Sequence, residues 1–156
     1  MKTINIVKLI VIAIIIPSAA LADIISGEVI KISDGDTLTI LTDAKIQLKV
    51  RLAEIDAPEK KQAFGNISKQ ALSSLCFRKK AIVNTTEKDR YGRILGKVTC
   101  AGIDANAEQV RTGMAWVYDK YVTDKSLYEI QDQAKNNKIG LWADPNPAPP
   151  WLFRHQ

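Results

Sequence analysis

The sequence predicts an α+β domain in which five short strands and about three helices suit a small closed β-barrel of the OB type. Two observations lead to this prediction. Several segments alternate between apolar and polar residues with a period of two and are separated by polar turns. Helical patterns follow the third and the fifth of these segments, an order that fits the OB arrangement.

The first three strands are expected within residues 24–55. Residues 24–42 read as two short strands around Asp34-Gly35, because Asp-Gly is a strong turn signal. Residues 44–55 give the clearest strand pattern, and its period of two places Arg51 on the side away from the apolar face. The apolar positions of this strand are Ile46, Leu48, Val50 and Leu52. Two more strands are expected at residues 80–86 and 93–99, joined by a polar hairpin that ends in Gly92.

Three helices are expected in the remaining segments. Asn66 can cap a helix that runs to about Phe77, with Ile67, Ala71, Leu72 and Leu75 on one side. Residues 104–112 read as a helix closed by Gly113. Ser126 and Glu129 have the spacing of a capping box that opens a last helix, and this helix is expected to stop at Gly140.

The two ends of the chain are expected to lie outside the domain of residues 23–143. Residues 1–22 have a positive start, an apolar run and the A-x-A site Ala20-Leu21-Ala22, which together predict a signal peptide. A membrane anchor is the alternative, but the apolar run is short for a span of about 20 residues. Residues 144–156 contain four prolines, so this tail is expected to be extended, with Trp151 and Phe153 available to dock on the domain.

Charge and cysteine content limit the functional classes. Without the two lysines of the predicted signal peptide, the net charge falls from +5 to +3, which is compatible with a polyanionic partner but does not identify one. The two cysteines, Cys76 and Cys100, follow an export signal, which favours a disulfide over two separate buried thiols. With one histidine and no CxxC pair, a zinc site is improbable.

Three charged motifs carry the functional prediction. Asp34-Gly-Asp36 is followed by Arg51-Leu-Ala-Glu-Ile-Asp56-Ala-Pro-Glu59 and then by Asp89-Arg-Tyr-Gly-Arg93. Carboxylates suit a hard cation, and planar guanidinium groups suit a phosphate. Each motif alone has an ordinary interpretation as a turn. Together they hold the groups needed for metal-assisted cleavage of a phosphodiester, and the single histidine, His155, excludes a mechanism with two imidazoles.

The order and the residues of these motifs resemble those of the thermonuclease (staphylococcal nuclease) family, and the resemblance extends along nearly all of the mature chain. The resemblance sharpens the barrel prediction and implies an endonuclease that hydrolyses DNA and RNA with little sequence specificity, using Ca²⁺ and leaving 3′-phosphate ends. It assigns metal binding to Asp36, Asp56 and the backbone carbonyl of Ala57, where the family often has Thr. It assigns phosphate binding to Arg51 and Arg93, and the role of general base to Glu59.

Aromatic residues and two rival functions complete the predictions. Tyr91, Tyr118 and Tyr121 are candidates to stack on bases, although Tyr118 and Tyr121 can instead pack beside the last helix. The main alternative to an enzyme is a non-catalytic OB-fold module that binds single strands, and a calcium-stabilised structural domain is a weaker one. We expect a monomer without stable protein partners, exported to the periplasm or the extracellular space. The sequence does not distinguish between these two compartments.

Overall fold

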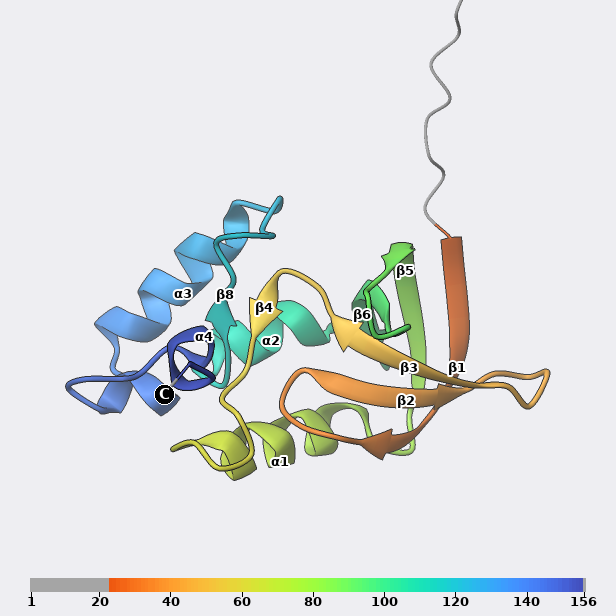
Figure 1. Ribbon diagram of the computed structural model, residues 1–156, viewed down its shortest axis with the longest axis horizontal. Coiled ribbons are helices and arrows are strands. Elements are labelled where there is room, and N and C mark those ends of the chain that lie inside the picture. Colours follow the sequence, from red (N-terminus) through yellow and green to blue (C-terminus); the bar gives the residue numbers. More distant parts are fainter. Residues whose placement is uncertain (1–22, 156) are drawn as a thin grey trace, which may run out of the picture.

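The computed structural model describes residues 23–155 and confirms a closed five-stranded barrel (Figure 1). The predicted signal peptide, residues 1–22, lies outside the described residues. Neighbouring strands pair in the order β3-β2-β1-β5-β6, and β3 also pairs with β6 in parallel, which closes the barrel. The five strands are β1 (Asp23–Ile32), β2 (Thr37–Leu41), β3 (Gln47–Leu52), β5 (Lys80–Lys88) and β6 (Ile94–Cys100).

Short strands and helices attach to this barrel. A short strand, β7 (Ile103–Asp104), extends the sheet beside β6, while β4 (Ile55–Asp56) and β8 (Trp116–Val117) form a separate antiparallel pair. The described chain has four α-helices, one more than predicted, and a 3-10 turn at Gly140–Ala143. The helices are α1 (Gly65–Cys76), α2 (Ala105–Arg111), α3 (Ser126–Asn136) and α4 (Pro150–Phe153).

The predicted alternation of apolar and polar residues in β3 matches burial only in the part of the strand that lies within the barrel. Val50 and Leu52 of β3 are fully buried, together with Val29, Leu38, Ile40, Val83 and Val98 from the other strands. Leu48 is half-buried, and Ile46 is 56% exposed in the turn before β3. The prediction of one continuous apolar face from Ile46 was therefore wrong, because the β2–β3 hairpin extends beyond the core.

The start and the inner face of α1 also differ from the prediction. The helix begins at Gly65 after Phe64, which has a φ of 66°, and no side chain caps it, so Asn66 is not the N-cap. A Cβ at residue 65 would lie 2.0 Å from the carbonyl oxygen of Glu59, which explains the glycine. Ile67 is 49% exposed, whereas Ser68 is buried and donates a hydrogen bond to the Met114 carbonyl at 2.6 Å. The inner face of α1 therefore carries the hydrogen-bonded hydroxyl of Ser68 where the prediction placed an apolar side chain.

The predicted capping box at the start of α3 is wrong. Lys125, the residue before the helix, has helical backbone angles and no capping side chain. Instead, the Ser126 backbone N–H and hydroxyl both donate to the Asp124 carboxylate, at 3.1 and 2.6 Å. The helix ends at Asn136 rather than at Gly140, because Lys138 turns into the left-handed region with a φ of 51°. By contrast, α2 agrees with its predicted range, and the Asp104 carboxylate caps it by accepting from the Ala107 N–H.

The C-terminal tail is not extended throughout, which corrects the prediction from its prolines. Residues 150–153 form α4, with Pro150 at its first helical position. This position tolerates proline because its N–H would lack a helical partner in any case. Figure 1 shows α4 beside β4 and β8, at one end of the barrel. The tail is therefore a docked element of the domain.

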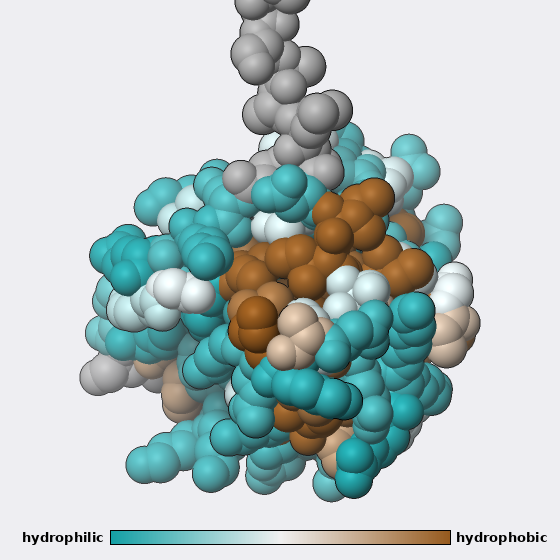
Figure 2. Space-filling model, turned by 90° about the vertical axis from the view of Figure 1, so that its right-hand side faces the viewer, coloured by the Kyte–Doolittle hydropathy of each residue, from teal (hydrophilic) through white to brown (hydrophobic). Residues whose placement is uncertain are grey.

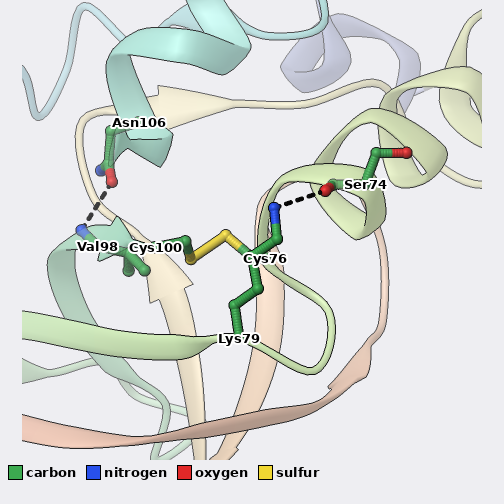
Figure 3. Close-up of a disulfide and its surroundings, with 6 residues drawn as sticks. All are labelled: Ser74, Cys76, Lys79, Val98, Cys100 and Asn106. Atoms are coloured by element: carbon green, nitrogen blue, oxygen red, sulfur yellow. Dashed lines mark hydrogen bonds between the residues drawn. A yellow bond between two sulfur atoms is a disulfide. The ribbon is translucent and has the colours of Figure 1, made fainter. Parts of the chain in front are cut away.

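Cys76 and Cys100 form the predicted disulfide (Figure 3). Their sulfur atoms are 2.08 Å apart and join the last residue of α1 to the last residue of β6. Both residues are fully buried within the main core. The bridge thus fixes α1 against the barrel.

Replacing both Cys76 and Cys100 with Ala should lower the free energy of unfolding by roughly 3–4 kcal/mol, because the unfolded chain regains the freedom of a closed loop whose ends are 24 residues apart. Urea unfolding of the oxidised wild type and of the double variant measures the difference. A dithiothreitol-treated wild type should match the variant. Equal stability of the oxidised and reduced wild type would contradict the prediction.

One outer face of the barrel is apolar. Figure 2 shows brown surface on this side, framed by polar residues. Ile24 of β1, Ile82 of β5 and Ile46 before β3 are exposed large apolar residues. None of them lines the cleft described in the next subsection. Among residues 23–155, no helix has the length and apolar character needed to cross a membrane.

Candidate active site

The three charged motifs converge on one open cleft with a volume of about 980 Å³. Asp36, Asp56 and Glu59 lie along it with Arg51 and Arg93, so the fold brings together residues that are up to 57 positions apart in sequence. Tyr91, Tyr118 and Tyr121 line the same cleft, as do Lys88, Arg90 and Lys97. The cleft therefore combines carboxylates, cations and aromatic rings.

Arg51 bridges the two aspartates that the sequence nominated for metal binding. Its Nη2 atom lies 3.3 Å from Asp36 Oδ2 and 2.8 Å from Asp56 Oδ1. Its Nη1 donates to the backbone carbonyls of Leu52 and Ile55, at 3.2 and 3.0 Å. As predicted, Arg51 points away from the barrel interior, but its side chain is enclosed by partners rather than extended into solvent. One cationic nitrogen thus contacts both carboxylates.

Asp36 is held by groups from three parts of the chain. The hydroxyl of Thr37 donates to Oδ1 at 2.9 Å, and the backbone N–H of Ala57 donates to Oδ2 at 2.8 Å. The Asp36 carbonyl accepts from the Leu52 N–H at 2.8 Å. Asp36 and Asp56 are both buried, so their carboxylates have few alternative orientations.

Buried side chains from α1 and α2 hold the loop before Asp36. The Gln109 amide donates to the carbonyl of Gly35 at 2.6 Å and to that of Ser68 at 3.2 Å. Gly35 approaches α1 so closely that a Cβ would lie 1.8 Å from the Ser68 hydroxyl. Sequence reasoning did not identify Gln109, because a glutamine within a helical pattern has no distinguishing signal.

The crowding of carboxylates alters their protonation. Burial and the nearby charge of Asp36 raise the pKa of Asp34 to about 6. Burial also raises the pKa of Asp56, an effect that the hydrogen bond from Arg154 and the charge of Arg51 oppose. For Arg51, burial lowers the pKa, but the charges of Asp36 and Asp56 outweigh it and the net change is upward. This end of the cleft therefore concentrates negative charge that favours a cation.

Glu59 has an unexpected partner. Arg154, from the C-terminal tail, approaches Glu59 Oε1 with its Nη1 atom at 2.6 Å and Asp56 Oδ2 with its Nη2 atom at 2.7 Å. These contacts, with the hydrogen bond to Asp56 first, raise the pKa of Arg154 despite its partial burial. Sequence reasoning did not identify Arg154, because this residue follows a proline-rich segment with no recognisable motif.

Arg93 lies in the β5–β6 turn, where a single aspartate organises the backbone. Asp89 Oδ1 accepts from the backbone N–H groups of Tyr91 and Arg93, at 2.8 and 2.9 Å, and Oδ2 accepts from Arg93 Nε at 2.6 Å. Although burial acts in the opposite direction, these bonds lower the pKa of Asp89. The Arg93 guanidinium also lies 5.5 Å from the centre of the Tyr91 ring. Tyr91 itself is 74% exposed and free to contact a ligand.

Tyr118 and Tyr121 pack edge to face, with ring centres 4.9 Å apart. Trp151 of α4 stacks on Tyr118 in parallel, at 5.4 Å and an interplanar angle of 3°. The same indole meets Trp116 edge-on at 5.6 Å. Trp116 belongs to a small cluster with buried Trp142. Tyr118 thus packs against the tail.

Another part of the cleft lining is held by two further acidic side chains, Glu54 and Asp124. Glu54, with a φ of 67° in the turn after β3, accepts hydrogen bonds from the backbone N–H groups of Thr123 and Asp124 at 2.8 and 3.2 Å. Lys97 donates to Asp124 at 2.6 Å, and this bond together with that from Ser126 lowers the pKa of Asp124 to about 2. These contacts join the β3–β4 turn to the segment that carries Tyr121.

The donor set around Asp36 and Asp56 fits a calcium ion that takes further oxygen ligands from the backbone or from water. Asp36 and Asp56 are close enough to contact one cationic nitrogen, and Ala57 lies beside them, so the local donors are all oxygen atoms. Within residues 23–155, no three His, Cys, Asp or Glu side chains form a metal-binding cluster. A cation here would therefore need the Ala57 carbonyl or water to complete its shell.

Comparison with known proteins decides the family. The sequence profile described as "Staphylococcal nuclease homologue" matches residues 49–144. The chain belongs to the staphylococcal nuclease family. Among its relatives, an uncharacterized endonuclease of Haemophilus influenzae is 50% identical over 128 residues, which cover 82% of this chain and 72% of the relative. A micrococcal nuclease of Shigella flexneri is 44% identical over 139 residues, which cover 82% of this chain and 79% of the relative.

A third relative, an uncharacterized endonuclease of Escherichia coli, is 44% identical over 133 residues, which cover 85% of this chain and 86% of the relative. Membership of the staphylococcal nuclease family confirms the predicted enzyme class, a hydrolase of phosphodiester bonds. It also agrees with the barrel, on which the site residues occupy strand ends and turns.

Proposed function

We propose that this member of the staphylococcal nuclease family is an exported, calcium-dependent endonuclease that cleaves DNA and RNA with little sequence specificity and leaves 3′-phosphate ends. The observation that carries the proposal is the arrangement around Arg51. Two buried aspartates share one cationic nitrogen, and Glu59 is linked to one of them through Arg154. These groups line a cleft that also holds Arg93.

Each group has a role that follows from the charge of a phosphodiester. Asp36, Asp56 and the Ala57 carbonyl would hold Ca²⁺, which supplies positive charge that offsets the charge of the phosphate as it is attacked. Arg51 and Arg93 bind the phosphate oxygens, and their guanidinium groups stabilise the charge that develops in the transition state. Glu59 takes a proton from the attacking water.

The rest of the cleft supports a single-stranded substrate. Tyr91 and Tyr121 are exposed, and base stacking on such rings tolerates any sequence. Lys88, Arg90 and Lys97 line the same cleft and can accompany the phosphate backbone. Recognition through stacking and charge, without base-specific contacts, accounts for low sequence selectivity and for activity on both nucleic acids.

Export is supported by the predicted signal peptide and by the buried disulfide. The pair Cys76–Cys100 would form in an oxidising compartment such as the periplasm or the extracellular space. We expect the enzyme to act there as a monomer.

Digestion of single-stranded DNA by the purified protein tests the proposal directly. Cleavage should appear with millimolar-range Ca²⁺ and vanish when EGTA removes it, because the charge of the bound ion is needed in the transition state. Binding of the same DNA, measured by fluorescence anisotropy, should persist without calcium. Cleavage that ignores the chelator would contradict the calcium site. Binding without cleavage at any calcium concentration would favour the alternative of a non-catalytic single-strand-binding module.

A further inference from the structure

The C-terminal tail is held against the cleft by several independent contacts. Trp151 is stacked on Tyr118 and meets Trp116 edge-on. Gln62, in the loop before α1, donates from its amide to the Ala148 carbonyl at 2.6 Å. Pro150 is buried at the start of α4. The tail therefore has a defined docked position, which places Arg154 at the end of α4 inside the cleft.

Arg154 forms ion pairs with Asp56, the proposed calcium ligand, and with Glu59, the proposed general base. Its Nη2 atom lies 2.7 Å from Asp56 Oδ2, and its Nη1 atom lies 3.2 Å from Asp56 Oδ1, so the guanidinium takes up both oxygens of this carboxylate. Its Nη1 atom also contacts Glu59 Oε1 at 2.6 Å. A carboxylate bound on both oxygens by a guanidinium has fewer lone pairs left for a metal ion, and a glutamate held by a guanidinium has fewer lone pairs left for a water molecule.

From these contacts we infer that the C-terminal tail is an autoinhibitory latch. In the latched state Arg154 competes with the cation for Asp56 and holds Glu59 in an ion pair, while Trp151 covers the ring face of Tyr118. The inference rests on the proposed calcium-dependent function. Calcium binding and substrate stacking each favour the released tail, so either one weakens the latch.

The structure distinguishes this latch from a merely structural tail. Trp151 meets Trp116 of β8 edge-on and Pro150 is buried, and neither contact requires an arginine that reaches into the cleft. The Arg154 side chain is partly exposed, so water could solvate its guanidinium and the fold does not require its ion pairs. Its contacts with Asp56 and Glu59, rather than with Asp144 or Asp132 elsewhere on the surface, place the charge where a cation would act.

Calcium affinity of the purified protein, measured by isothermal titration calorimetry without nucleic acid, tests the latch. Arg154→Gln should bind Ca²⁺ roughly 3- to 10-fold more tightly than the wild type, as expected when a competing ion pair of modest strength is removed. Arg78→Gln is the matched control. It removes the same charge from an exposed pair with Glu28 that does not line the cleft, and it should leave the affinity unchanged.

A second variant tests whether docking of the tail is needed for Arg154 to compete with Ca²⁺ for Asp56. Trp151→Ala keeps Arg154 but removes its anchor on Tyr118, and it should also bind Ca²⁺ more tightly, by a smaller factor. Unchanged or weaker affinity in Arg154→Gln, with normal binding by the wild type, would overturn the latch and leave the proposed function intact. Absence of calcium binding in every variant, including Arg154→Gln, would overturn both.

Discussion

Replacing Glu59 with Gln should lower the rate of DNA hydrolysis by a factor of about 10²–10⁴, the usual contribution of a positioned general base. Glutamine has nearly the same shape but cannot take a proton from water. The Glu59 side chain is 40% exposed and, among the residues that the structure describes, forms an ion pair only with Arg154, so loss of this pair should change the free energy of unfolding by less than about 1 kcal/mol. Initial rates on single-stranded DNA, combined with urea unfolding, measure both quantities.

Glu28→Gln provides the control for this experiment. Glu28 is an exposed carboxylate on β1, paired with Arg78 at 3.2 Å and outside the cleft. The control variant should retain the wild-type rate. DNA binding by Glu59→Gln should persist, because the substitution removes a negative charge from the cleft. A rate within a factor of two of the wild type would show that Glu59 is not the base.

Replacing Arg51 with Met should have the largest effect on stability, a loss of roughly 3–5 kcal/mol, together with loss of activity. Removing one partner of a buried ion pair leaves the other charge without compensation. Here Asp36 would lose the contact with Arg51, while Asp56 would lose Arg51 but keep Arg154. The carbonyls of Leu52 and Ile55 would lose a donor as well. A bound calcium ion can neutralise the same two carboxylates in place of the lost guanidinium. Calcium should therefore raise the free energy of unfolding of Arg51→Met more than that of the wild type.

Arg93→Met separates the role of the arginines in binding phosphate from the role of Arg51 in stabilising the fold. Arg93 is paired with Asp89 in the β5–β6 turn, so its replacement should lower the free energy of unfolding by no more than about 1 kcal/mol. It should still lower the rate of hydrolysis. Thermal unfolding with and without Ca²⁺ gives the comparison. Equal stability of Arg51→Met and the wild type would show that the buried aspartates do not depend on Arg51.

Local patterns predicted the strands, and the resemblance to the staphylococcal nuclease family predicted the closed barrel and the residues of the cleft. Period-two alternation located the strands, and charged residues beside Asp-Gly, Asp-Ala-Pro and Tyr-Gly turns located the cleft. Contacts that join distant segments were not predictable in this way. Arg154 reaches Asp56 only because Trp151 docks on Tyr118, and Gln109 holds Gly35 only because α2 packs beside the loop. Neither arrangement leaves a periodic signal.

The capping errors have a related cause. Ser126 has a suitable spacing to Glu129, but Asp124, two residues earlier, supplies a stronger acceptor and takes both Ser126 donors. Asn66 likewise lost its expected position because the close approach of Gly65 to Glu59 sets where α1 begins. In both cases a neighbouring polar group or backbone segment outweighed the local preference of a single residue.

The parallel pairing of β3 with β6 has a consequence for when the enzyme becomes active. This pairing sets Arg51 opposite Leu95, two residues beyond Arg93, and it joins strands that are more than 40 positions apart in sequence. Contacts of such sequence separation are slow to form, because the intervening chain must lose its freedom before they stabilise it. The two arginines are thus brought together only as the barrel closes. Under the proposed export, a chain still unfolded on its way out of the cell would carry every proposed catalytic residue and yet be harmless to the nucleic acid of that cell.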